Sequence, residues 1–429
     1  MKKILIVSYF YKPSNFVAVE RIESWVKYLP DNGFFPIVVT RNWNENQKTI
    51  VERVHKNELH VFKTSLSEIH SLPVYRSIRD RCSDFRILKP LQKFFTLFEL
   101  LFSNFFNSFL PFSNFLPYCE KLIKENPLID TVIVSGTPFK AYSIGYRLKK
   151  KFPHLVWIPD YRDEWTTHQN TDNVYPILNK LLFKLDRKSE IKWTSNSNFF
   201  ITVSTPWRDS IKKLIKKDGV VVKNGFKELI PRTNKSESDP SKLKIVYAGT
   251  MYDSQPIELF ISSIISYCKK ICSGIKLEVH FIGTEIMKTV DLKLRHLTKE
   301  YPEVFHFSKR LNKIELLKNT IDTDIFLLTS FKNVIGWYPV KLFDYYSKGK
   351  PILLIPSDGS VIEEFLHKTN SGYVVNSEIE LHQLLDKLFQ KKKNKLPIPY
   401  YPNHKEAAIF LRENQTKILA DKLKEYSNN

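Results

Sequence analysis

The chain opens with a pattern that predicts a strand, a helix and a second strand. Residues 1–11 form a continuous apolar run, as expected of a strand buried on both faces of a parallel sheet. Between Val19 and Leu29 apolar residues recur at helical spacing, and the glycine of residues 31–33 ends that pattern. The run FPIVVT then predicts the second strand. The alternation recurs at residues 129–136, 154–163 and 198–206, which is typical of a doubly wound α/β domain.

A polar stretch with two prolines, PRTNKSESDPSK at residues 231–242, interrupts this pattern and is interpreted as a linker. Strand and helix patterns then restart, with strands expected at residues 243–250, 275–284, 323–330 and 350–357 and a helix at 257–268. At 429 residues the chain is too long for one core. We therefore expect two Rossmann-like domains, residues 1–230 and 243–402, facing a central cleft. Residues 403–429 are expected to form a terminal helix that crosses back to the first domain.

Charge and cysteine content narrow the partners and the compartment. The formal charge is +21, and residues 1–230 carry 36 basic against 22 acidic side chains, leaving 30 and 23 for the rest. This excess favours an anionic partner such as a phosphate or an anionic membrane surface. Nucleic acid is not expected, because no recognisable binding module is present. The four cysteines form no CxxC pair, which favours a reducing, cytoplasmic location. No apolar run approaches the length of a spanning helix.

An aromatic segment between Leu72 and Tyr118 does not follow this alternation of strand and helix patterns. It contains KPLQKFFTLFELLFSNFFNSFLPFSNFLPY, and arginines at positions 76, 79, 81 and 86 precede it. A basic, aromatic stretch of this kind is typical of a segment in a membrane interface. A helix packed against the N-terminal sheet is the alternative. The basic excess favours the membrane-interface interpretation. We therefore expect the protein to bind at the inner face of the cytoplasmic membrane.

The candidate ligand site lies where strands end, because open α/β sheets bind ligands at the carboxyl ends of their strands. The segment GWYPVKLFDYYSKGKPILLI runs through a proline into a short helix and then a strand. Backbone amides of Val340, Lys341 and Leu342 are expected to face a diphosphate there, with the lysine adding a charge. Asp344, one turn later, is a candidate for ribose hydroxyls. A solvated lysine is the alternative for Lys341.

Six segments, in order, resemble bacterial glycosyltransferase family 4 of the cell-surface polysaccharide type, which has the GT-B fold. YKPSNFVAVERIESWVKYLPDNGFFPIVVT resembles the family's first loop and helix, and SGTPFKAYSIGYRLKKKFPHLVWIPDYRDEW resembles its TGPPHS and DFRDPW blocks. VVKNGF resembles the NGFD that closes the N-terminal domain, YAGTMYDSQP resembles the start of the donor domain, and TDIFLLTS resembles its late strand. PVKLFDYYSKGKPIL is similar to the PGKLFEYLA-GKPIL segment that binds the donor's diphosphate and ribose.

The resemblance implies an enzyme that moves a hexose or N-acetylhexosamine from a nucleotide sugar, expected to be UDP-linked, to a glycan or polyprenyl-linked glycan. It implies retention of configuration and no metal cofactor. The expected catalytic residues are Asp163, Lys341 and Arg310. Donor-binding residues are expected at Gly249, Thr250, Gly283, Arg310, Val340, Lys341, Leu342 and Asp344, and acceptor-binding residues at Phe16, Arg21, Thr137, Arg162, Asp163 and His168.

Several of these positions have structural alternatives. Arg162 is equally well interpreted as a partner of a neighbouring carboxylate, and Arg21 as part of the surface of the first helix. Asp322-Thr323-Asp324 matches a DxD metal motif by letter, but it leads directly into a buried strand and is interpreted as a coincidence.

The departures from the family pattern keep two other functions open. Asn15, Phe16 and Ala18 stand where the family's first loop has glycines, and Val340 replaces the glycine of PGK. Ser254 and Gln255 stand where an arginine often meets the diphosphate. These changes are compatible with a different donor, weaker donor binding or loss of activity. The alternatives are a non-catalytic GT-B protein that binds a sugar or a partner, and a nucleotide-sugar epimerase.

Overall fold

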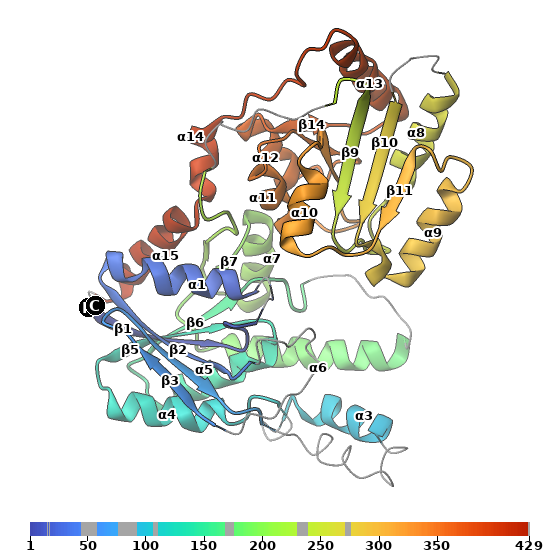
Figure 1. Ribbon diagram of the computed structural model, residues 1–429. Coiled ribbons are helices and arrows are strands. Elements are labelled where there is room, and N and C mark those ends of the chain that lie inside the picture. The colour runs from blue at the N-terminus through green and yellow to red at the C-terminus, as the bar shows by residue number, and fades with distance from the viewer. Residues whose placement is uncertain are drawn as a thin grey trace. The chain divides into compact units, whose positions relative to one another are not determined.

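A computed structural model describes residues 1–14, 16, 18–43, 58–75, 92–105, 110–167, 176–229, 239–270 and 276–427. The chain forms two compact units (Figure 1). Unit 1 comprises Met1–Asn224 and Arg412–Asn429, and unit 2 comprises Gly225–Leu411. Within the described residues, no helix combines the length and the apolar composition that crossing a bilayer requires.

Unit 1 is built on an eight-stranded sheet in the order β3-β4-β2-β1-β5-β6-β7-β8. All neighbouring strands are parallel except β3 and β4. The central strands are apolar on both faces, as in Ile4 to Val7, because helices cover both sides. The strands are β1 Lys2–Ser8, β2 Phe34–Arg41, β3 His60–Lys63, β4 Glu68–Leu72, β5 Ile129–Ser135, β6 Val156–Tyr161, β7 Phe200–Thr202 and β8 Gly219–Val221.

The helices of unit 1 form a layer on each face of this sheet. Helices α1 and α15 contact each other, and their apolar residues join Ile4 and Ile6 in one core. Helices α4, α5 and α6 pack in sequence against one another, and α5 contacts β5 and β6. The helices are α1 Ala18–Tyr28, α3 Gln92–Phe102, α4 Phe115–Glu125, α5 Tyr142–Lys151, α6 Pro176–Thr194, α7 Thr205–Ile215 and α15 Arg412–Ser427.

Unit 2 has a six-stranded parallel sheet in the order β11-β10-β9-β12-β13-β14, the doubly wound order of a Rossmann fold. Residues of α8, α9 and α13 share a core with one face, and residues of α11 and α12 with the other. The strands are β9 Lys242–Ala248, β10 Lys276–Ile282, β11 Phe305–Ser308, β12 Ile325–Leu328, β13 Ile352–Leu354 and β14 Gly372–Val374. The helices are α8 Glu258–Lys270, α9 Lys288–Thr298, α10 Lys313–Thr320, α11 Val340–Tyr346, α12 Val361–Thr369, α13 Glu378–Lys393 and α14 His404–Ala407.

The contacts place the unit boundaries at residues that differ from those expected from the sequence. The residues after 402 do not form one helix: α14 ends at Ala407, and α15 begins at Arg412. Helix α14 belongs to unit 2, because the His404 ring lies 3.2 Å from the Tyr346 hydroxyl. The backbone of Phe226 bonds to Phe410, which places residues 225–229 in unit 2 as well. Residues 231–238 of the expected linker lie outside the described residues.

Candidate functional site

The strand order of unit 2 reverses at β9, so the carboxyl ends of β9, β10 and β12 mark the expected ligand crevice. Gly249 follows β9 with φ +106°, and Gly283 follows β10 with φ +84°, conformations that side chains rarely adopt. The amide of Gly249 donates to Ile282 at 2.7 Å, and a Cβ on Gly283 would lie 3.6 Å from the Gly249 Cα. The two predicted donor glycines therefore lie against each other at this edge.

Lys341 reaches the same edge from α11. Its Nζ donates to the hydroxyl of Tyr247 and to the carbonyl of Thr250, each at 2.5 Å, and lies 4.1 Å from the centre of the Tyr247 ring. A Cβ on Gly249 would lie 2.9 Å from the Lys341 Cε. The absence of a side chain at Gly249 thus makes room for the lysine. The structure brings together Gly249, Thr250, Gly283 and Lys341 of the predicted donor set.

Burial lowers the pKa of Lys341 from its ordinary 10.5 to about 7, and the nearby carboxylate of Asp344 opposes that shift. Tyr247 also faces the ammonium, and burial raises the pKa of its hydroxyl well above 10, so this phenol stays neutral. The lysine is therefore not the solvated side chain that the sequence left as an alternative. It is a desolvated amine that gains a proton readily when an anion approaches.

The start of α11 differs in part from the expectation. The amide of Leu342 donates to Pro339 at 3.0 Å, and its side chain is fully buried. Leu342 is therefore a core residue whose amide is already engaged, which corrects its predicted contact with a diphosphate. Val340 is half-buried at the first helical position, and Asp344 is exposed one turn later.

Arg310 follows β11, and its backbone packs against the donor glycines. Its Cα lies 3.5 Å from the position of a Cβ on Gly283, and its amide donates to the Glu285 carboxylate at 2.7 Å. The side chain is exposed. Because this side chain is exposed, its guanidinium can turn toward an anion at this edge without leaving a buried position.

Gln255 belongs to a buried network that the sequence analysis missed. Its amide nitrogen donates to the Thr329 hydroxyl at 2.7 Å, and its oxygen accepts from the Tyr252 amide at 3.0 Å and from the Tyr247 hydroxyl at 3.3 Å. Gln255 is 4% exposed. It thus supports the tyrosine that holds Lys341. The available signal was its position in the loop that follows the first strand of the unit.

In unit 1 the equivalent strand ends surround Asp160, a second residue that sequence reasoning missed. This fully buried carboxylate accepts from the Arg21 guanidinium at 2.8 Å and from the Ser135 hydroxyl at 2.8 Å. Arg21 is 3% exposed and also donates to the Val222 carbonyl at 2.7 Å. Its donors are occupied within unit 1, so Arg21 holds α1 to the sheet. This corrects both its predicted acceptor contact and its surface alternative.

The other predicted acceptor residues of unit 1 differ in their surroundings. Arg162 donates to the carbonyls of Gly136 and Thr137, rather than to a neighbouring carboxylate, and burial lowers its pKa. Asp163 is exposed beside it. Phe16 belongs to an aromatic cluster, with its ring 4.9 Å from Phe10 and 5.6 Å from Trp43. His168 lies outside the described residues.

The DxD-like acids lie in ion pairs at the start of β12. Asp324 pairs with Lys392 at 2.7 Å, and both side chains are almost completely buried. Asp322 pairs with Lys244 at 2.5 Å and with Lys242 at 3.2 Å. These contacts support the interpretation of the motif as a coincidence, because each carboxylate already neutralises a lysine.

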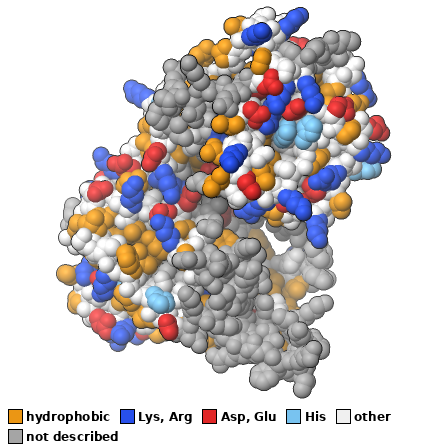
Figure 2. Space-filling model, viewed as in Figure 1, with side chains coloured by type: hydrophobic (Ala, Val, Ile, Leu, Met, Phe, Trp, Pro, Cys, Tyr) orange, Lys and Arg blue, Asp and Glu red, His pale blue; other side chains and the backbone are white. Residues whose placement is uncertain are grey.

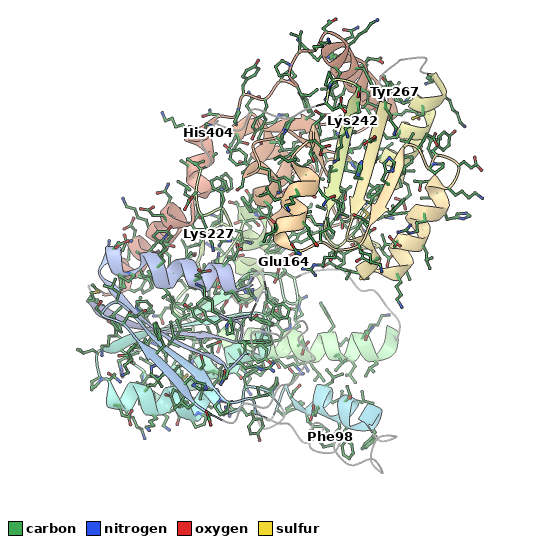
Figure 3. The ribbon with its side chains drawn as sticks, viewed as in Figure 1. Phe98, Glu164, Lys227, Lys242, Tyr267 and His404 are labelled. Carbon is green, nitrogen blue, oxygen red and sulfur yellow. The ribbon has the colours of Figure 1, made fainter. Side chains whose placement is uncertain are left out.

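The described part of the aromatic segment includes an exposed apolar helix. Seven of the 11 residues of α3 are Phe or Leu. Phe94 is 62% exposed and Leu100 43%, while Phe98 projects from α3 and stacks on Phe102 (Figure 3). Helix α3 contacts α6, whose residues Lys180, Lys184, Arg187 and Lys188 are exposed. The four predicted flanking arginines lie outside the described residues.

No family profile matches the chain, and no curated protein matches its sequence. Solved structures do match. Sucrose-phosphate synthase from Thermosynechococcus elongatus is 12% identical with a TM-score of 0.63, and 99% of each chain is covered. HepE of Anabaena, in complex with UDP and glucose, is 11% identical with a TM-score of 0.57, covering 99% of this chain and 100% of HepE. The lipopolysaccharide outer core galactosyltransferase WaaB is 14% identical with a TM-score of 0.52, with 99% of each covered. These likenesses confirm the predicted GT-B fold of two Rossmann-like domains.

Proposed function

We propose that the protein is a glycosyltransferase that binds the diphosphate of a nucleotide sugar at the strand ends of unit 2. One observation carries the proposal: Lys341, with its pKa lowered to about 7, lies beside Gly249 at the edge where this fold binds ligands. Desolvation destabilises the charged form of a lysine, and strongly shifted pKa values cluster at functional sites. The matching folds include HepE in complex with UDP and glucose and a galactosyltransferase, which supports a UDP-linked hexose or N-acetylhexosamine as the donor.

In the proposed reaction an acceptor hydroxyl oxygen forms the new bond to the sugar C1. The bond from C1 to the diphosphate oxygen breaks, its electron pair leaves on the diphosphate, and the hydroxyl proton passes to that phosphate. The leaving group gains negative charge, so a cation at the diphosphate stabilises the transition state more than the ground state. Lys341 supplies this charge from unit 2, and the exposed Arg310 adds a second. Because the acceptor attacks from the same face of the sugar on which the diphosphate leaves, this route retains configuration, and it uses no metal.

Unit 1 supplies the acceptor side of the proposal. The carbonyls of Gly136 and Thr137 fix Arg162, which leaves Asp163 exposed at the carboxyl end of β6. This position suits hydrogen bonds to a sugar hydroxyl of the acceptor. We propose a glycan or polyprenyl-linked glycan acceptor used in cell-surface polysaccharide synthesis.

A lipid-linked acceptor fits the surface made by α3 and α6. Exposed Phe and Leu side chains on α3 suit the acyl boundary of a membrane, and the basic side chains of α6 suit anionic headgroups. We therefore propose peripheral binding at the inner face of the cytoplasmic membrane. Sedimentation with vesicles of anionic and zwitterionic lipid tests this. We expect binding to the anionic vesicles, and loss of that binding in Phe94→Asp. Equal sedimentation of the variant and the wild type would contradict the membrane proposal.

The donor proposal is tested by calorimetric titration with UDP, GDP and dTDP sugars. At pH 8 a lysine of pKa about 7 is mostly neutral, so diphosphate binding should take up close to one proton. Proton uptake is measured by repeating the titration in buffers of different ionisation enthalpy. Lys341→Met should abolish both binding and transfer. The exposed Lys318 of α10 provides the matched control, and Lys318→Met should behave as the wild type.

Two outcomes would contradict the proposal in different ways. Unchanged binding and transfer in Lys341→Met would remove this lysine from the diphosphate site. Failure of the wild-type protein to bind any nucleotide sugar would exclude both enzyme functions, transferase and epimerase. The non-catalytic alternative would then explain the family departures at Val340 and Gln255.

A further inference from the structure

One face of the unit 2 sheet is polar over the first half of its strands. Side chains two residues apart in a strand share a face, so Lys242 and Lys244 of β9 lie on one side. The register pairs Lys244 with Glu278 of β10, and His280 of β10 with His306 of β11. Figure 2 shows histidine side chains among basic and acidic ones on the visible surface. This patch lies outside the proposed donor site.

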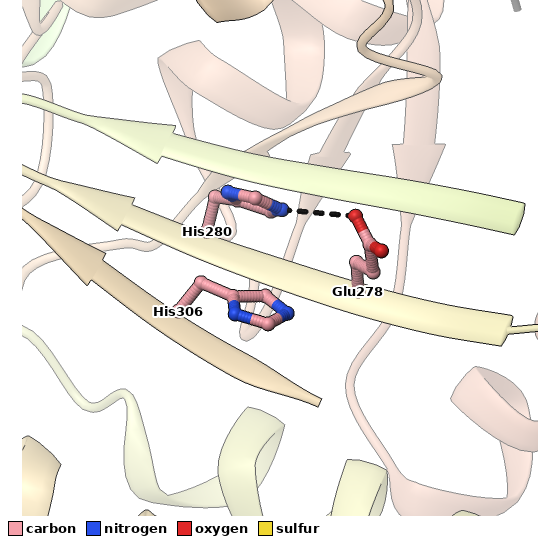
Figure 4. A group of neighbouring side chains, drawn as sticks. All are labelled: Glu278, His280 and His306. Carbon is pink, nitrogen blue, oxygen red and sulfur yellow. Dashed lines mark hydrogen bonds and ion pairs between the residues drawn. The ribbon is translucent and has the colours of Figure 1, made fainter. Parts of the chain in front are cut away.

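Within this patch Glu278, His280 and His306 converge (Figure 4). One ligand atom from each of the three side chains lies within 4.8 Å of the others. The His280 Nε2 lies 3.2 Å from the Glu278 Oε2, and the two imidazole rings are 4.7 Å apart between centres. Among the described residues the His306 Nε2 has no hydrogen-bond partner, although solvent does not reach that atom. A buried imidazole nitrogen without a partner is unfavourable and suits an absent ligand.

We propose that Glu278, His280 and His306 form a binding site for a divalent transition-metal ion, with Zn²⁺ as the representative ion. Two imidazole nitrogens and one carboxylate oxygen are a ligand set that favours Zn²⁺ over Ca²⁺ or Mg²⁺, which prefer oxygen ligands. The three protein ligands leave a fourth position for water. Partial exposure, 27% for the His280 side chain and 12% for Glu278, provides an entry path for the ion.

Metal binding at this site requires one proton to move and lysines to be displaced. In the free chain the His280 Nε2–H donates to Glu278, so on binding this proton passes to Nδ1 through solvent and the Nε2 lone pair binds the ion. Lys276 lies 3.2 Å from the Glu278 carboxylate, and Lys242 lies 3.7 Å from it. Lys276 is 58% exposed and can turn to solvent, while Lys242 keeps its pair with Asp322 at 3.2 Å. These lysines weaken the site without blocking it.

The site would fix the edge strand of the unit 2 sheet. His306 lies on β11, which pairs with β10 at the end of the strand order. The three residues from His280 to Gly283 correspond to about 10 Å along a strand, so the ion would lie near the donor glycines without reaching them. Zinc should therefore raise the thermal stability of the protein through mass action. The proposal does not depend on the proposed transferase activity.

The test is competition between the full-length, tag-free chain and a chromophoric zinc indicator at pH 7.5, with Zn²⁺ alone as the ligand. We expect one zinc ion per chain. His280→Ala and His306→Ala should each weaken binding by more than the roughly 10–100-fold that loss of an outer partner costs. Lys276→Ala removes a competing cation and should tighten binding severalfold. A matched control is His367→Ala, because His367 pairs with a single carboxylate, Glu363, at 3.4 Å.

Circular dichroism in EDTA establishes that each variant folds. Should an alanine variant unfold, His306→Gln replaces it, and the d–d absorption of Co²⁺ bound to the wild-type chain reports its ligands directly. If the wild-type chain binds no zinc at a 100-fold molar excess of Zn²⁺ over protein, the proposal is overturned. Binding that both histidine substitutions leave unchanged, or a Co²⁺ spectrum without nitrogen ligation, also overturns it.

Discussion

Replacement of Lys341 by methionine should make the protein more stable at low pH and inactive. Methionine has nearly the same length and is apolar, so it fills the same space next to Tyr247 without a charge. The pKa of Lys341 falls from 10.5 to about 7 through burial, and each unit corresponds to 1.36 kcal/mol, so holding the charge costs about 5 kcal/mol. Loss of the hydrogen bonds to Tyr247 and Thr250 offsets about 1–3 kcal/mol of the gain.

The pH dependence of this effect follows from proton binding. Below pH 7 the ammonium is charged in both the folded and unfolded chains, and the full cost is present. Between pH 7 and pH 10.5 the unfolded chain binds more protons at Lys341 than the folded chain, so the free energy of unfolding of the wild type rises. Above pH 10.5 the amine is neutral in both states and the cost is absent. The advantage of Lys341→Met should therefore shrink by about 4 kcal/mol from pH 6 to pH 10.5, where the unfolded chain is still half-protonated at this lysine.

Urea unfolding of wild type and variant at pH 6, 8 and 10 measures this difference. The two units can unfold in separate transitions, so the comparison uses the transition that shifts between the two proteins. Lys318→Met should match the wild type at every pH. If the difference in free energy of unfolding between Lys341→Met and wild type stays constant from pH 6 to pH 10, the pKa of Lys341 is not lowered in the folded chain. The desolvated-amine argument for the diphosphate site would then be refuted.

Three further predictions concern other positions in the two units. Arg21→Met or Asp160→Asn alone should lower the free energy of unfolding by about 3–5 kcal/mol, because each leaves its charged partner buried and unpaired. The double variant should recover part of this loss, as measured by urea unfolding. Burial raises the pKa of Glu190 to about 7, so the ionised carboxylate costs stability above pH 7 and not below pH 4.5. Glu190→Gln should therefore be more stable than wild type by about 3 kcal/mol at pH 8 and equal to it at pH 4, and equal melting temperatures at both pH values would exclude this explanation. Gly249→Ala places a methyl group 2.9 Å from the Lys341 Cε at a φ of +106°, so calorimetry should show at least about tenfold weaker UDP binding, and unaltered affinity would contradict the packing argument.

The central strands could be predicted from the sequence, and the edge strands could not. Strands β1 and β5 are apolar on both faces over most of their length because helices cover both sides, and this leaves an unmistakable run in the sequence. Strands β11 and β14 have four and three residues, too few to establish a period. Strand pairing with a neighbour far along the chain, rather than local composition, forms them.

The candidate site shows the same division between local and distant information. Lys341 was predicted because the proline, the short helix and the following strand are contiguous. Its partners Tyr247 and Thr250 lie more than 90 residues earlier, and no local pattern connects them to it. Arg21 is different, because the signal was present: it lies four residues before Trp25, which is 1% exposed. A residue at that spacing shares the buried face of the helix.

The buried Gln255 stands near the position at which the family that the sequence resembles often has an arginine. Three hydrogen bonds satisfy its amide group, and a neutral amide is what a 4% exposed position tolerates, whereas an arginine there would bring an uncompensated charge. In the proposed reaction the diphosphate then depends on Lys341 and Arg310. Since the lysine is mostly neutral above pH 7, donor binding must itself draw in the proton that supplies the charge. The affinity for a nucleotide sugar should therefore fall as the pH rises above 7, which is the opposite of the stability trend at the same lysine.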